Sequence, residues 1–150
     1  MSDITALKAL YETYYQNAVK ARQGASAFAG VFGMGDDPRR HPCHDAFYEA
    51  LAQWVEEFAA AAPDTAAVNE VVRWILEAPL HNRGTDTFWY LYAAQGHTKA
   101  LIPLLDASDR KALAQWYEDS FPKRERLPVQ AEVCKLLKQE ASKQRKKLFW

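Results

Sequence analysis

The sequence predicts an all-α protein, a single compact domain of six or seven helices packed as an irregular helical bundle. Apolar residues recur every three or four positions along almost the whole chain, which is the spacing of one buried helix face. No stretch alternates apolar and polar residues as a half-buried strand does. Glycines and prolines divide the 150 residues into segments of helical length, and a chain this long is typical of one domain.

The first two helices are expected on either side of a long loop. An apolar stripe runs as far as Ala21, and Gly24 is expected to end that helix. Residues 24–41 hold four glycines and are therefore predicted to form a loop. Pro42 suits the first turn of the second helix, because an N–H at that position needs no partner within the helix. This second helix is expected to end before Pro63.

The central helices are predicted from their caps and breakers. Asp64 or Thr65 is expected to cap a third helix, which Pro79 closes. Thr85 or Asp86 is expected to cap a fourth helix that is apolar on most sides, as is typical of a central helix.

The stretch from Thr85 to Ala107 resembles the helix–turn–helix half of an ankyrin repeat. The resemblance rests on Ala93-Ala94-Gln95-Gly96-His97 and on the leucines at 101, 104 and 105. An ankyrin unit buries its apolar face against neighbouring copies, and no second copy follows one period away. We therefore interpret the stretch as two helices joined at Gly96, the second of them short and apolar, and assign no family.

The last two helices follow from the remaining caps and prolines. Ser108 is expected to cap a helix that ends near Pro122. Pro128 is expected to begin a basic C-terminal helix over residues 128–147.

Composition and charge exclude several classes of protein. With 49% hydrophobic and 25% charged residues, the chain is neither a disordered tail nor a disulfide scaffold. Its 19 basic and 19 acidic residues exclude a surface that is basic throughout. The charge is nevertheless divided: residues 1–75 carry 6 basic and 10 acidic residues, a net of −4, and residues 76–150 carry 13 and 9, a net of +4.

The compartment is predicted from the cysteines and the hydropathy. No signal peptide is recognisable, and no run of apolar residues is long enough to span a membrane. Cys43 and Cys134 have neither metal-ligand nor redox spacing, which fits a reducing environment. These observations predict a cytoplasmic protein.

One candidate site is the segment at residues 36–45, which joins the predicted loop to the second helix. Its chemistry-bearing residues are Asp36, Asp37, Arg39, Arg40, His41, Cys43 and His44. Three chemistries are open: a zinc site that would also need His81 or His97, a Cys43 nucleophile activated by the helix N-terminus, and an anion site at the arginines. The simplest alternative is a loop whose aspartates and arginines pair locally.

A second candidate is an interaction surface made of aromatic and basic residues. Its members are Trp74, Trp89, Tyr90, Lys143, Arg145, Lys146, Lys147, Phe149 and Trp150. Clustered exposed aromatics mark protein interfaces, whereas basic residues on a terminal helix usually form a solvated face.

The sequence contains no recognisable catalytic motif. It therefore predicts a non-catalytic helical binding or interaction protein without a cofactor, whose partner is another protein or a second copy of the chain. One alternative is a small enzyme or a metal- or anion-binding protein centred on residues 36–45. The other is nucleic-acid binding through the basic C-terminal helix, for which the affinity would fall steeply with salt.

Overall fold

The computed structural model describes residues 4–32, 42–81 and 88–148, with side chains at 4–21, 42–81 and 89–138. Within these residues the chain forms six α-helices and four short 3-10 helices, and no strand. The all-α class predicted from the sequence is confirmed.

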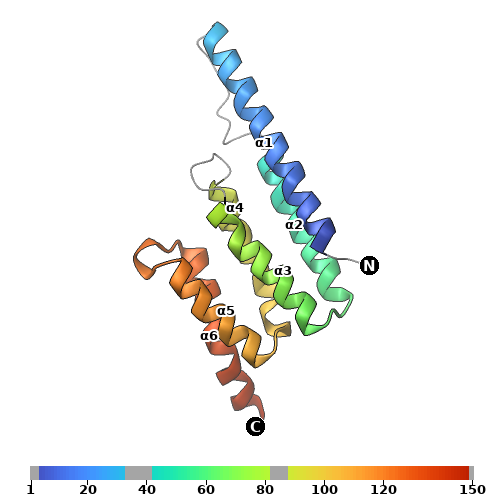
Figure 1. Cartoon of the computed structure of the whole chain (residues 1–150), viewed down its shortest axis with the longest axis vertical. Helices are drawn as coiled ribbons and strands as arrows, with labels where there is room; N and C mark the ends of the chain where they lie inside the picture. Colours follow the sequence, from blue (N-terminus) through green and yellow to red (C-terminus); the bar gives the residue numbers. More distant parts are fainter. Residues whose placement is uncertain (1–3, 33–41, 82–87, 149–150) are drawn as a thin grey trace.

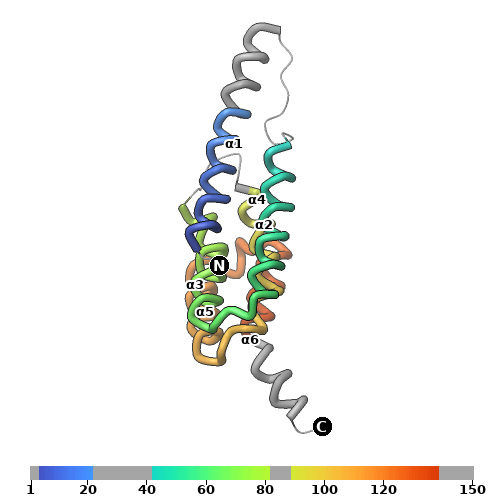
Figure 2. Tube along the Cα trace, turned by 90° about the vertical axis from the view of Figure 1, so that its right-hand side faces the viewer, coloured from blue at the N-terminus to red at the C-terminus, as the bar shows by residue number. Residues whose placement is uncertain are grey.

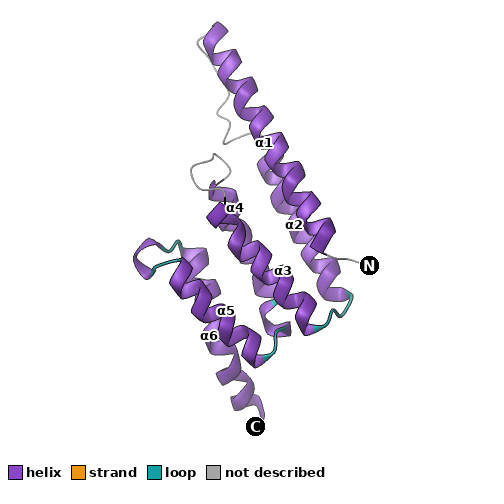
Figure 3. Cartoon of the chain, viewed as in Figure 1, coloured by secondary structure: helices purple, strands orange, loops and turns teal. Residues whose placement is uncertain are grey.

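The helices are numbered in chain order, as labelled in Figure 1. The α-helices are α1 (Ile4–Phe32), α2 (Pro42–Ala60), α3 (Thr65–Glu77), α4 (Phe88–Ala94), α5 (Ala107–Ser120) and α6 (Pro128–Leu148). The 3-10 helices are η2 (Ala78–His81), η3 (Gln95–Ala100), η4 (Ile102–Leu104) and η5 (Lys123–Glu125). A short loop joins α2 to α3, and short loops flank η5 between α5 and α6 (Figure 3).

Two antiparallel helix pairs form the two sides of the molecule. Helices α1 and α2 lie side by side, and α5 and α6 form the second pair (Figures 1 and 2). The short helix α4 contacts both α2 and α6, so it lies between the pairs, and α3 contacts both α1 and α5. This arrangement sets the first half of the chain against the second half.

One apolar core connects all six helices. Its α1–α2 end is aromatic: the rings of Tyr14 and Phe47 stack at 4.1 Å, and Tyr11 meets Phe47 edge-on at 5.0 Å. Such ring pairs add directional packing energy to the burial of apolar area. The aromatic end of the core therefore fixes how α1 and α2 lie against each other.

The first helix is longer than the sequence predicts. The expected end at Gly24 is wrong, because α1 continues to Phe32 through the first part of the predicted 24–41 loop. A glycine inside a helix costs only about 1 kcal/mol relative to alanine, and the residues around Gly24 include several alanines, the strongest helix formers.

The helix starts agree with the predictions at three of four positions that can be compared. Pro42 and Pro128 begin α2 and α6, and the Asp64 carboxylate caps α3 by accepting a 2.8 Å hydrogen bond from the Ala67 N–H. The cap of α5 is Asp106, so the prediction of Ser108 is wrong by two residues. The predicted caps of the fourth helix, Thr85 and Asp86, lie outside the described residues.

The chain after α4 differs from the predicted pair of α-helices. Gly96 lies inside η3, and the apolar stretch that follows forms η4 in place of a short α-helix. Pro103 has no N–H to donate, and the amides after it bond to carbonyls three residues earlier, as in a 3-10 helix. The Leu104 N–H donates to the Leu101 carbonyl at 2.9 Å. The ankyrin-like helix pair is therefore not formed.

Candidate functional site

The candidate site at residues 36–45 is only partly within the described residues. Asp36, Asp37, Arg39, Arg40 and His41 lie outside them. Cys43 and His44 lie on the first turn of α2, where Cys43 is half-buried and His44 is only 1% exposed.

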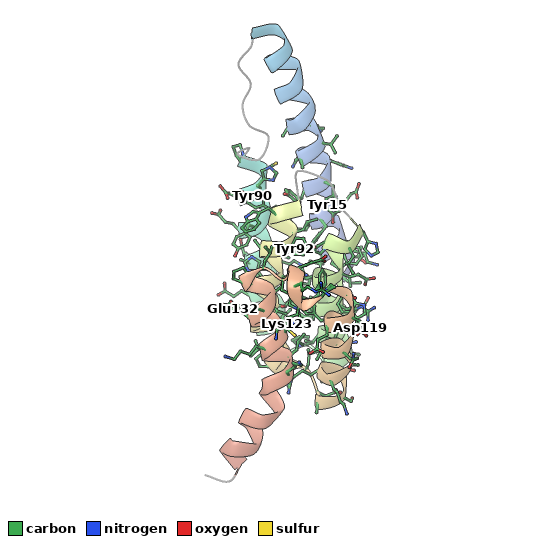
Figure 4. The ribbon with its side chains drawn as sticks, turned by 90° about the vertical axis from the view of Figure 1, so that its left-hand side faces the viewer. Tyr15, Tyr90, Tyr92, Asp119, Lys123 and Glu132 are labelled. Atoms are coloured by element: carbon green, nitrogen blue, oxygen red, sulfur yellow. The ribbon has the colours of Figure 1, made fainter. Side chains whose placement is uncertain are left out.

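Residues from three helices surround His44. Its Nδ1 and the Tyr14 hydroxyl oxygen on α1 are joined by a 2.7 Å hydrogen bond. The Tyr90 ring on α4 stacks on the imidazole at 4.5 Å, and Phe47 stacks on Tyr14 from the other side. We call Tyr14, His44, Phe47 and Tyr90 the histidine cluster. Figure 4 shows Tyr90 and Tyr15 at the same height of the molecule, above Tyr92.

Burial controls the ionisation of the groups around His44. It raises the pKa of Tyr14 well above its ordinary value and also raises the pKa of Tyr90, to which the nearby Asp45 carboxylate adds. Burial raises the pKa of the Cys43 thiol too, and the hydrogen bond at the helix start offsets only part of this. Burial thus shifts the pKa of this thiol in the direction opposite to the activation that the helix N-terminus is expected to provide. At neutral pH these phenols and this thiol are protonated.

The described residues hold no group of three or more His, Cys, Asp or Glu side chains placed to bind a metal ion. His81 is exposed and lies 3.3 Å from the Glu77 carboxylate. The His97 ring contacts the Tyr48 ring at 4.3 Å, and burial lowers the pKa of His97. Both histidines that the sequence offered as additional zinc ligands thus have other neighbours.

The aromatic candidates for an interaction surface have different surroundings. Trp89 on α4 is 60% exposed, and Tyr48 on α2, which the sequence did not single out, is 37% exposed. Tyr90 lies half-buried against His44. Tyr48 is one helical turn beyond His44 on α2 and its ring contacts His97, while Trp89 and Tyr90 are consecutive residues on α4, which packs against α2.

Trp74 belongs more to the core than to a surface. It is half-buried, it meets the Tyr11 ring edge-on at 6.1 Å, and the Lys8 ammonium lies 5.2 Å from its ring centre. Its indole N–H is buried and has no hydrogen-bond partner among the described residues. Trp74 is therefore packed partly against the core and remains partly exposed.

The basic candidates at the C-terminus stay predictions. The positions Lys143, Arg145, Lys146 and Lys147 lie on α6, but their side chains are outside the described residues, as are Phe149 and Trp150.

A groove between α5 and α6 was not predicted from the sequence. It has a volume of about 500 Å³, and Arg110, Lys111 and Lys138 supply its cationic lining. Arg110 is only 3% exposed. The sequence does contain a signal for the burial of Arg110, because this residue falls on the same helical stripe as the buried residues Leu113, Ala114 and Tyr117. A charged residue on an apolar stripe is unusual, since charged side chains are rarely buried without a partner.

Comparison with protein-family models, characterised proteins and solved structures found no match to this chain. Among the described residues, no helix combines the length and the apolar character needed to cross a membrane.

Proposed function

We propose that this chain is a non-catalytic helical interaction protein whose contact surface is the aromatic face, defined as Tyr48, Trp89 and Tyr90, and whose partner is a second copy of the chain. The observation that carries the proposal is the 60% exposure of the Trp89 side chain. An exposed tryptophan on α4, together with the exposed Tyr48 on the neighbouring helix α2, supplies the large, rigid contact area that anchors protein interfaces.

The position of α4 supports a dimer with two-fold symmetry. The net charge is −4 for residues 1–75 and +4 for residues 76–150, and α4 lies between the helix pairs that belong to these halves (Figure 1). An antiparallel two-fold dimer centred on α4 would set each acidic half against the basic half of its partner. In such a dimer the same surface serves both copies.

The chemistry of the histidine cluster supports a non-catalytic role. Burial raises the pKa values of its tyrosines and of the adjacent Cys43 further above neutrality, so these groups keep their protons at neutral pH. A general base or nucleophile needs the opposite adjustment. The proposed location is the cytoplasm, where the two free cysteines, Cys43 and Cys134, would stay reduced.

The test is sedimentation velocity of the full chain over a wide concentration range, on wild type and Trp89→Ala. We expect a reversible dimer whose dissociation constant rises at least about tenfold in Trp89→Ala, because a central aromatic anchor is removed. The charge arrangement also requires that the dimer weakens as the salt concentration rises.

Val19→Ala is the matched control, since Val19 is a comparably exposed apolar residue, 54% exposed, and lies on α1, whereas the aromatic face is on α2 and α4. It should leave the dissociation constant unchanged. A chain that stays monomeric up to about 200 µM would overturn the proposal, as would an equal effect of both substitutions.

A further inference from the structure

Arg110 has hydrogen-bonding capacity that the described residues do not use. Its Nη2 donates to the Leu105 carbonyl oxygen at 2.8 Å, which closes the turn before α5. Its Nε and Nη1 are buried and have no hydrogen-bond partner among the described residues. These two nitrogens carry three N–H groups, so more than half of the five guanidinium donors lack an acceptor. A buried cation in this state is unfavourable unless something accepts those bonds.

Among the described residues, no carboxylate forms an ion pair with Arg110. The Asp106 carboxylate, which accepts the Asp109 N–H and the Ser108 hydroxyl as the α5 cap, interacts electrostatically with Arg110 but accepts none of its buried N–H groups. Glu118 pairs with Lys138 across the groove. The ion pairs formed among the described residues also leave Lys111 without a carboxylate partner. Arg110 and Lys111 thus line the groove without forming an ion pair among the described residues.

The rest of the groove is apolar. Ala107 and Ala114 on α5 and Leu137 on α6 complete its lining, within a volume of about 500 Å³. This volume lies in the range of sites that hold small organic molecules. A ligand that matches this lining has a single anionic group and a hydrocarbon part.

We propose that the α5–α6 groove binds a small aliphatic monocarboxylate, with its carboxylate on the Arg110 guanidinium and its hydrocarbon chain against Ala114 and Leu137. A planar carboxylate matches the fixed fork of guanidinium donors. A phosphate dianion fits less well, because the Glu118 carboxylate lies in the same lining. The Nε and Nη1 atoms are shielded from solvent, so the ligand reaches them only when the side chains that cover them move.

The test is a titration of the full chain with sodium hexanoate, followed by proton–nitrogen correlation spectra that include the Arg110 Nε–H signal. We expect saturable shifts of that signal and of α5 and α6 amides at concentrations up to about 20 mM. 1-Hexanol, which has the same chain without the charge, should give no shift of the Nε–H signal. Inorganic phosphate should bind at least about tenfold more weakly than hexanoate.

Two variants distinguish binding at the groove from a nonspecific effect. Arg110→Met keeps the apolar bulk of the side chain and should weaken hexanoate binding at least about tenfold. Ala107→Trp fills the groove from an exposed position on α5 while leaving the guanidinium in place, and should weaken binding as well. Ala107→Trp serves as the test if Arg110→Met does not fold.

The proposal is overturned if hexanoate gives no saturable shift, if a folded Arg110→Met or Ala107→Trp binds as wild type does, or if phosphate binds as tightly as hexanoate. None of these outcomes depends on whether the chain dimerises through the aromatic face, because the groove lies between α5 and α6.

Discussion

His44 illustrates how neighbours from distant parts of the chain determine the environment of a single side chain. Tyr14 lies 30 residues before it and contributes the hydrogen bond at its Nδ1, while Tyr90 covers one face of the ring. A buried imidazole nitrogen that loses its partner is costly, because no water replaces the bond. The histidine cluster is thus a structural element of the α1–α2–α4 contact.

We predict that Tyr14→Phe lowers the free energy of unfolding by about 2 kcal/mol, because it removes the hydroxyl bonded to buried His44 and preserves the ring. Urea denaturation monitored by circular dichroism measures the change. Tyr48→Phe is the control, since Tyr48 is exposed, and it should change the stability by less than about 0.5 kcal/mol. Equal effects of the two substitutions would show that the Tyr14 hydroxyl contributes nothing.

The burial of His97 predicts that the stability of the fold depends on pH. Burial lowers the pKa of His97 below its ordinary value, and a backbone hydrogen bond with Tyr48 raises it less. The unfolded chain therefore takes up a proton at a higher pH than the folded chain does. The stability present above the unfolded pKa of about 6.5 is lost as the pH falls through the lowered folded value.

The corresponding measurement is urea denaturation between about pH 7.5 and about pH 5, on wild type and His97→Gln. We expect wild type to lose more stability over this interval than the variant does, because glutamine does not titrate. The loss of packing in the variant is measured separately, at the upper pH. Parallel stability curves would rule out a contribution from His97.

At the scale of elements, the start of α5 shows how similar capping residues compete. Asp106 and Ser108 are both good N-cap residues, and the Asp106 carboxylate takes the position, accepting from the Asp109 N–H at 2.8 Å and from the Ser108 hydroxyl at 3.1 Å. The hydrogen bond from the Asp109 N–H is the largest cause that lowers the pKa of Asp106. Ser108 thus supports the cap without being the cap.

We predict that Asp106→Ala lowers the melting temperature more than Ser108→Ala does at neutral pH. The difference should shrink as the pH falls through the lowered pKa of Asp106, because the stabilisation by its ionised form is lost there. Thermal unfolding followed by circular dichroism compares the two variants. A larger loss of melting temperature in Ser108→Ala would instead support Ser108 as the cap, as the sequence predicts.

At the scale of the whole molecule, one buried amide joins three elements. Gln95 in η3 donates its Nε2–H to the Leu76 carbonyl in α3 at 3.0 Å, and its Oε1 accepts from the Tyr117 hydroxyl in α5 at 3.2 Å. The Thr98 hydroxyl donates to the Gln95 backbone carbonyl at 2.7 Å. A hydrogen-bonded polar group in an apolar core specifies one arrangement of its neighbours.

We predict that Gln95→Leu lowers the free energy of unfolding by about 2 kcal/mol, because it removes a bond from the buried Leu76 carbonyl and one from Tyr117. A double-mutant cycle with Tyr117→Phe should show that the two substitutions together cost less than the sum of the single ones, by about 1 kcal/mol. Chemical denaturation of the four proteins gives the coupling. Additive losses would mean that the two side chains act independently.

Much of the fold is predictable from the sequence, and less of the candidate sites is. Pro42, Asp64 and Pro128 mark helix starts correctly, because a cap or a proline acts on the backbone within one turn. Gly24 does not end α1, since a single breaker competes with the helix formers around it. Such local reasoning does not show which groups bond to the buried Gln95, because Leu76 and Tyr117 are distant from it in the sequence.

The sequence by itself determined the all-α class, the order of the helices and the division of charge between the two halves, because periodicity, caps and composition are properties of neighbouring residues. The tertiary structure decided which side chains are covered. It buried Arg110 beside a groove, exposed Trp89 and surrounded His44 with residues from α1 and α4. Burial depends on which distant helices pack against a residue, and that information is spread over the whole chain.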